Sequence, residues 1–140
     1  MTLKVFSLLV LTAIFWGSTP VIEKYALTKA SPLAGVTVRS IAITVALIIF
    51  TLAAGRWSNV ADMPVKNKVL FSLSGIMAGL LGMLTYFYAL QAAPASRAVP
   101  IAASYPLVAA LLGIAFLGES FTISKLAGTI LIIAGVWLVK

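Results

Sequence analysis

The sequence contains no cysteine and no histidine, and only three of its 140 residues are acidic. Without thiols or imidazoles, the chain can form no disulfide and none of the usual metal sites built from sulfur or nitrogen ligands. The three acids are Glu23, Asp62 and Glu119, which are too few to support most forms of acid–base catalysis. We therefore expect no enzyme, no metal site and no cofactor.

Charge of either sign is scarce as well, since charged residues make up 9% of the chain and hydrophobic residues 62%. Soluble domains are about half apolar and about a quarter charged, and a soluble fold of this length could not bury so much apolar surface. The composition therefore predicts an integral membrane protein. The net charge of +7 lies mostly in loops and at span ends, which indicates contact with anionic membrane lipid and not with nucleic acid.

Five long apolar runs fill most of the chain, and each is close to the roughly 20 residues that a helix needs to cross a bilayer. The runs lack the polar–apolar alternation of barrel strands, so we expect helices. The predicted fold is a single all-α transmembrane domain over residues 1–140. The expected spans are about 3–28, 32–54, 69–92, 96–117 and 122–139. A signal peptide is the alternative for the first run, but no small-residue cleavage site follows it.

An odd number of spans would place the two termini on opposite sides of the membrane. A second copy inserted in the opposite orientation would complete an inverted pair, which is a common architecture of secondary transporters. Lysines and arginines divide almost evenly between the two sides, and so weak a bias permits insertion in both orientations. A single orientation with the N-terminus inside is the alternative.

Charged residues lie inside the first two apolar runs. Glu23 and Lys24 are near the end of the first span, and Arg39 is about as far from the start of the second, so Glu23 and Arg39 can meet at a similar depth. Intramembrane charges are candidate site residues. Two cations against one anion would suit an anionic or zwitterionic ligand, or would let Glu23 exchange a proton. The alternative is that Lys24 and Arg39 extend to the headgroups and Glu23 neutralises one of them.

Three prolines within the runs, Pro20, Pro100 and Pro106, are expected to break helices, because proline donates no backbone hydrogen bond. Paired irregular helices are a useful indication of a transporter's binding site. Polar and aromatic residues close to these prolines, or at the end of the third span, are therefore candidate cavity-lining residues. They are Trp16, Ser18, Tyr86, Gln91 and Ser104.

The third span contains Gly75, Gly79 and Gly82, which follow one another at i, i+4 and i+7 and would share one face of an α-helix. The pair Gly75–Gly79 forms a GxxxG motif, which lets a neighbouring backbone approach closely. Tyr86 would continue this face. The motif is consistent either with helix packing alone or with a face that seats a partner subunit.

Several expected helix ends follow from local signals. Ser31 before Pro32 is a typical helix start, and Thr122 can cap the fifth helix. Gly55 and Gly118 are expected to end the second and fourth spans. Glu119 is expected to have a structural role, through backbone amides or Lys125.

The order and spacing of several motifs resemble the EamA domain of the drug/metabolite transporter superfamily. The motifs are Trp16-Gly17-Ser18, Ser31-Pro32 followed by Arg39, and the segment Pro106–Leu138, PLVAALLGIAFLGESFTISKLAGTILIIAGVWL. The resemblance runs from about Val5 to Val139. Most relatives carry two such domains related by an inverted pseudo-two-fold axis and transport small metabolites, whereas this chain has one domain.

The resemblance implies a central cavity lined largely by the first, third and fourth helices, which favours Trp16, Ser18, Tyr86 and Ser104 as lining residues. Lys24 and Arg39 match positions that are often basic in the family. The expected function is thus a secondary transporter of a small molecule in the plasma (inner) membrane, working by alternating access as an antiparallel homodimer.

Two alternatives stay open at this point. One is an accessory or lipid-flipping subunit that pairs with another small membrane protein. The other is a small multidrug efflux subunit, for which Glu23 would be the membrane glutamate. The sequence has no GxxxxGK loop, so direct coupling to ATP is not expected. Substrate, transport direction and coupling ion do not follow from these patterns.

Overall fold

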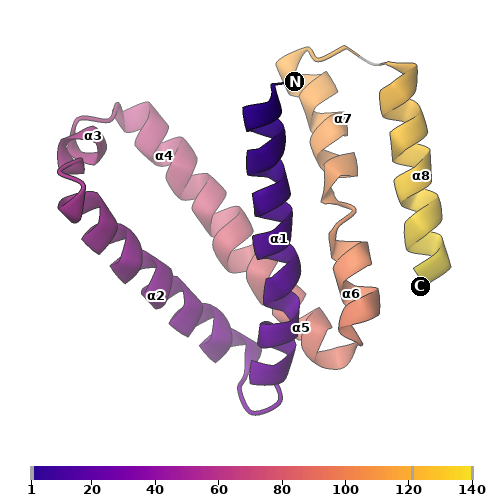
Figure 1. Ribbon diagram of the computed structural model, residues 1–140, viewed down its shortest axis with the longest axis horizontal. Helices are drawn as coiled ribbons and strands as arrows, with labels where there is room; N and C mark the ends of the chain where they lie inside the picture. The colour runs from indigo at the N-terminus through magenta and orange to yellow at the C-terminus, as the bar shows by residue number, and fades with distance from the viewer. Residues whose placement is uncertain (1, 121, 140) are drawn as a thin grey trace. The chain divides into compact units, whose positions relative to one another are not determined.

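The computed structural model describes residues 2–120 and 122–139, and within these ranges it consists of helices and their connections, without strands (Figure 1). The predicted all-helical fold is therefore confirmed. In chain order the elements are α1 (Leu3–Ala26), α2 (Pro32–Ala53), α3 (Trp57–Ala61), α4 (Val65–Ser74), the π-helical segment η1 (Gly75–Gly82), α5 (Met83–Ala92), α6 (Ala95–Ala102), α7 (Tyr105–Leu117) and α8 (Ile123–Val139).

Four stretches of the described chain are helical, long and apolar enough to cross a membrane. They are α1, α2, the continuous helix Val65–Ala92 and the pair α6–α7 over Ala95–Leu117. Helix α8 is apolar but has 17 residues, which makes it about 26 Å long at 1.5 Å per residue, slightly less than a typical hydrocarbon core. The fifth span and the inverted repeat therefore remain predictions.

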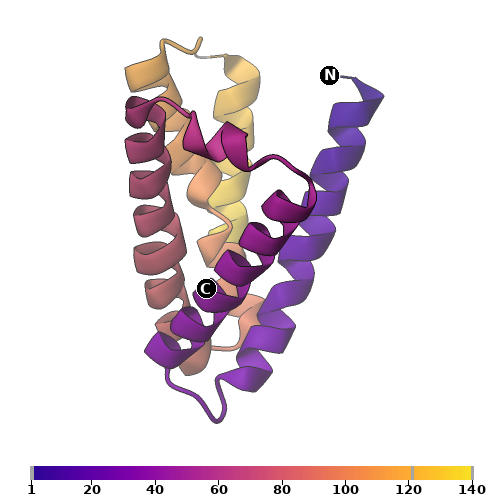
Figure 2. The same ribbon diagram turned by 90° about the vertical axis from the view of Figure 1, so that its left-hand side faces the viewer.

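The chain divides into two compact units. The central unit, Ile22–Gln91, contains the end of α1, all of α2 to α4 and most of α5. The terminal unit combines Met1–Val21 with Ala92–Lys140, and so contains most of α1 together with α6, α7 and α8. Within the terminal unit, α8 packs against both α6 and α7, and α7 and α8 run side by side (Figure 2).

Side chains cap the starts of α2 and α8 as the sequence predicts. The Ser31 hydroxyl accepts a hydrogen bond from the backbone N–H of Ala34 at 3.3 Å, and Pro32 follows as the first residue of α2. The hydroxyl of Thr122 accepts from the backbone N–H of Lys125 at 3.2 Å. Each cap satisfies one of the N–H groups that have no partner inside the helix.

Left-handed glycines follow the ends of α2 and α7. Gly55 has φ of 63° and Gly118 has φ of 66°, and the N–H of Gly118 donates to the carbonyl of Gly113. In this region an L side chain is strained, because its Cβ crowds the neighbouring carbonyl oxygen. The left-handed backbone at Gly55 and Gly118 therefore explains why α2 and α7 end where the sequence predicts.

Replacing Gly118 with alanine is expected to lower the free energy of unfolding by roughly 1–2 kcal/mol, because Ala at φ of 66° would be strained. The measurement is denaturant unfolding of the purified protein in detergent micelles. Gly128→Ala in α8 is the matched control, because its added Cβ would meet no atom within 4 Å and alanine favours the helix. Equal destabilisation by both substitutions would contradict the role assigned to Gly118.

The third span differs from the expectation in two respects. It begins at Val65, earlier than predicted, and its middle is the π-helical segment η1. Hydrogen bonding from i to i+5 puts more residues into each turn than in an α-helix. The prediction that Gly75, Gly79 and Gly82 share one helix face is therefore wrong, because Gly82 points in a different direction from the other two. Three glycines in η1 lower the conformational cost of leaving α geometry.

The described chain places no other atom near the first two of these glycines. A Cβ added at Gly75 or Gly79 would meet nothing within 4 Å, and one at Gly82 would meet the carbonyl oxygen of Met77 at 3.2 Å. Close helix packing at this motif is therefore not formed within the described part of one chain. It remains a prediction for a contact with a second chain.

The prolines also behave differently from one another. Helix α1 is continuous through Pro20, so the expected break there is wrong. The carbonyl of Trp16, which Pro20 cannot serve, accepts a hydrogen bond from the Thr19 hydroxyl at 3.1 Å, and a hydroxyl of this kind is a known substitute for a lost backbone donor in the membrane.

The fourth span does leave the helical conformation. Pro100 lies inside α6 without ending it, and this is a second correction to the expected breaks. The helix stops after Ala102, and α7 begins at Tyr105, directly before Pro106. The irregular segment thus lies at Ala103 and Ser104.

Candidate substrate site

The central unit has a small buried core where three helix ends meet. Leu27 directly after α1, Val36 on α2, and Phe87 and Leu90 on α5 are each at most 3% exposed. Gly35 permits the close approach of α5, because a Cβ at this position would lie 3.1 Å from the Phe87 ring. The apolar cluster therefore brings together the end of α1, the start of α2 and the end of α5.

Two side chains cap these helix ends reciprocally. Lys24 Nζ of α1 donates to the carbonyls of Leu90 at 2.6 Å and Gln91 at 3.2 Å, in the last turn of α5. Gln91 Nε2 of α5 donates to the carbonyls of Leu27 at 3.0 Å and Ala30 at 3.2 Å, just after α1. The last carbonyls of a helix have no intrahelical donor, and a cation is favourable there.

This reciprocal cap, Lys24 with Gln91, changes the interpretation of two predicted lining residues. Both side chains donate to backbone carbonyls of the partner helix end. Their hydrogen-bonding groups are engaged in holding the helix ends together. A role of Lys24 and Gln91 in lining a cavity remains a prediction.

Glu23 and Arg39 approach each other, as their similar depth in the sequence predicts. Arg39 Nε lies 3.7 Å from Glu23 Oε1, and the side chains are 39% and 12% exposed respectively. This separation is that of an ion pair and is too long for a hydrogen bond. Tyr86, another predicted lining residue, is partly buried on α5 of the same unit.

The terminal unit contains an aromatic pair beside the break of the fourth span. The rings of Trp16 and Tyr105 meet edge to face, with centroids 6.4 Å apart and an interplanar angle of 65°. Both side chains remain well exposed. Tyr105 is absent from the predicted lining residues, although its position between Ser104 and Pro106 was a usable signal.

The predicted serines bond to their own helices. Ser18 Oγ donates to the carbonyl of Phe15 at 2.9 Å, and Ser104 Oγ donates to the carbonyl of Ile101 at 2.7 Å. Their hydroxyls therefore relieve local backbone carbonyls. A role in lining the cavity remains a prediction for both.

Glu119 belongs to the connection between α7 and α8, as expected. Its Oε2 lies 2.9 Å from Lys125 Nζ, and its carboxylate rests over Gly113, where a Cβ would come within 3.1 Å. This ion pair links the end of α7 to the start of α8. Its role is structural.

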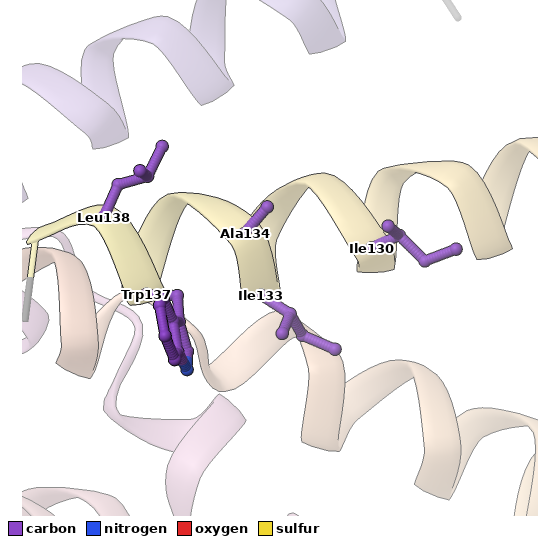
Figure 3. A pocket seen from close by; sticks show the side chains of 5 residues that line it. All are labelled: Ile130, Ile133, Ala134, Trp137 and Leu138. Carbon is purple, nitrogen blue, oxygen red and sulfur yellow. The ribbon is translucent and has the colours of Figure 1, made fainter.

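Helix α8 carries an open hollow lined by apolar side chains. The lining residues are Ile130, Ile133, Ala134, Trp137 and Leu138. Figure 3 shows Ala134 and Leu138 projecting from one side of α8, and Ile133 and Trp137 from the other. Such a surface suits contact with lipid chains or another apolar surface and provides no charge to orient a polar substrate.

A model of the EamA-like transporter family matches residues 3–140. An uncharacterized transporter from the cobO 3′ region of Sinorhizobium sp. is 27% identical over 128 residues, which cover 91% of this chain and 90% of that protein. An uncharacterized protein of Methanocaldococcus jannaschii is 28% identical over 130 residues, or 93% of this chain and 91% of that protein.

A further relative shares a shorter region. The probable 4-amino-4-deoxy-L-arabinose-phosphoundecaprenol flippase subunit ArnF of Serratia proteamaculans is 42% identical over 68 residues, which cover 47% of this chain and 52% of that protein. No solved structure matches the chain.

Proposed function

This chain belongs to the EamA-like transporter family and is a multi-pass protein of the plasma membrane, and from that premise we propose that it is a secondary transporter of a small metabolite. The observation that carries the proposal is the Glu23–Arg39 pair, which lies within two helices long and apolar enough to span the membrane. Charges in such positions are costly and mark substrate or ion pathways.

We propose further that the transporter is an antiparallel homodimer that works by alternating access. Two relatives are matched over nine-tenths of their length by this single domain, so chains of one-domain length recur among its relatives. The Gly75–Gly79 motif is open within the described chain and suits close contact with another helix. A second copy in the opposite orientation would supply the other half of the pathway.

The homodimer predicts that the chain inserts in both orientations. Alkaline phosphatase and green fluorescent protein fused after Lys140 are active on opposite sides of the membrane. If the chain inserts in both orientations, both fusions should be active. Adding lysines to the loop around Arg56 should shift the two signals in opposite directions, because Lys and Arg near span ends set orientation. A single active fusion, with or without added lysines, would overturn the antiparallel homodimer.

A second candidate function is an accessory subunit that pairs with a different small membrane protein. The similarity to a protein named as a probable flippase subunit, over about half of each chain, favours this candidate. It predicts a single orientation and copurification of a distinct partner. The reporter fusions therefore separate the two functions.

A further inference from the structure

We propose that Arg39 binds an anionic oxygen group, a carboxylate or a phosphate, at the end of the central unit where α1, α2 and α5 meet. The inference rests on the proposed transport function and names the ligand class of its site. It also predicts that Lys24 and Gln91 position the site and that neither is the primary contact of the anion.

The first reason for this proposal is that the hydrogen-bond donors of Arg39 are unfilled within the described chain. A guanidinium group presents a planar fork of N–H donors and no acceptor. Glu23 lies at 3.7 Å from Nε, and within residues 2–120 and 122–139 Arg39 donates no side-chain hydrogen bond. Glu23 balances the charge of Arg39 at ion-pair distance but leaves the N–H donors of the guanidinium group unfilled. A carboxylate or phosphate would match this fork with two parallel hydrogen bonds.

The local charge carries the second step. This end of the central unit contains two cations, Lys24 and Arg39, and one anion, Glu23, so it has an excess of positive charge. The ammonium group of Lys24 is held by the carbonyls of Leu90 and Gln91. It therefore acts as a fixed positive charge, while the guanidinium group has donors to offer.

Packing carries the third step. Val36 is 2% exposed and lies three residues before Arg39, on the same side of α2. The backbone that carries Arg39 is therefore anchored by the buried cluster, while its side chain, 39% exposed, remains accessible. Binding would therefore require ordering of the Arg39 side chain but no ordering of the backbone, which limits the entropic cost.

Two sources can supply the anion. Arg39 lies seven residues after Pro32, roughly 10 Å along α2, a depth that a lipid phosphate or a dissolved anion can reach. Both sources share the same recognition chemistry. The experiment therefore needs one arm for each.

The test follows the side-chain Nε–Hε resonance of Arg39 by NMR in nanodiscs with ¹⁵N-labelled arginine. The chain contains only three arginines, Arg39, Arg56 and Arg97, so Arg39→Lys assigns the signal. The lipid arm compares phosphatidylcholine with phosphatidylglycerol nanodiscs. The soluble arm titrates inorganic phosphate and acetate into phosphatidylcholine nanodiscs.

We expect the Arg39 signal to shift in at least one arm, and the responding arm identifies the source. In that arm, Arg39→Lys keeps the charge but lacks the planar fork, so anion affinity measured from backbone resonances of Val36 should fall about tenfold. Glu23→Gln keeps Arg39 and removes a competing carboxylate, so affinity should hold or rise. An unchanged Arg39 signal in both arms, or equal affinity for Arg39→Lys, would overturn the site.

The readout is independent of transport and of orientation. Failure of the Arg39 response overturns the anion site and leaves the reporter-fusion result untouched. A single orientation in the reporter assay overturns the homodimer and leaves the Arg39 response untouched.

Discussion

Removing the reciprocal cap by Lys24→Met and Gln91→Leu is expected to destabilise the protein by about 3 kcal/mol, because four hydrogen bonds are lost. Lys24→Met alone is expected to cost about 2 kcal/mol and Gln91→Leu alone about 1.5 kcal/mol, because a hydrogen bond donated by a charged group is stronger than one donated by an amide. Loss of Lys24 leaves the carbonyls of Leu90 and Gln91 without this donor. Unfolding of the purified protein in mixed micelles measures the change, and hydrogen exchange around Leu27 and Leu90 should accelerate.

Lys29→Met is the matched control for this prediction. Lys29 is exposed near the same helix ends, and its described side chain takes part in no ion pair or hydrogen bond, so its loss should change stability by less than about 0.5 kcal/mol. If Lys24→Met is no more harmful than Lys29→Met, the cap does not hold the helix ends.

The two single variants and the double variant also form a thermodynamic cycle. Lys24 and Gln91 cap the ends of one another's helices, so loss of either should weaken the contact made by the other. We expect the double variant to cost less than the sum of the single variants, by at least about 0.5 kcal/mol. Simple additivity would show that the two caps act separately.

Local signals in the sequence predicted the parts of the fold that depend on a few adjacent residues. The caps at Ser31 and Thr122 and the left-handed stop at Gly118 are decided within one helical turn. The approach of Glu23 to Arg39 followed from equal depth on consecutive antiparallel helices. Each of these requires no knowledge of distant contacts.

Contacts between distant segments were beyond such signals. The acceptors of Lys24 and Gln91 are backbone carbonyls 61 to 67 residues away along the chain. Every residue has a carbonyl, so the sequence does not mark those particular ones. The approach of Trp16 to Tyr105 likewise depends on packing within the terminal unit.

The irregular helices show how one residue type can mislead. A proline within a helix predicts a break because it removes a donor, yet α1 continues through Pro20. The hydroxyl of Thr19, directly before it, serves the carbonyl that the proline leaves free. The neighbouring threonine was the missed signal, and the π-helical turn at Gly75–Gly82 had no comparably specific one.

Replacing Pro106 with alanine is expected to join α6 and α7 into one helix. The substitution restores a backbone N–H that can donate to the carbonyl of Ala102, and it removes a ring that opposes a continuous helix at a cost of about 3 kcal/mol. In a continuous helix the backbone N–H of Tyr105, the first residue after the break, would donate to the carbonyl of Ile101. Its hydrogen exchange should therefore slow by roughly ten- to hundredfold, whereas the amides of Ala103 and Ser104 already donate to Val99 and Ile101.

Joining α6 and α7 by Pro106→Ala would also alter the contact between Trp16 and Tyr105. Continuing the helix through Ala103 and Ser104 would rotate Tyr105 relative to α6 and so disrupt its edge-to-face contact with Trp16. If the aromatic pair lines the pathway, a substrate found by screening metabolites in proteoliposomes should be transported at least about tenfold more slowly by the Pro106→Ala variant.

Pro20→Ala is the matched control, because both substitutions remove a proline from an apolar helix of the same chain. Helix α1 is already continuous at Pro20, and the Trp16 carbonyl already has the Thr19 hydroxyl as its donor. Exchange of the amides around Trp16 should therefore change by less than about threefold, since the restored N–H replaces a hydrogen bond of similar strength. Equal slowing by the two substitutions would show that the break depends on something other than Pro106, and unchanged transport by Pro106→Ala would remove Tyr105 from the pathway.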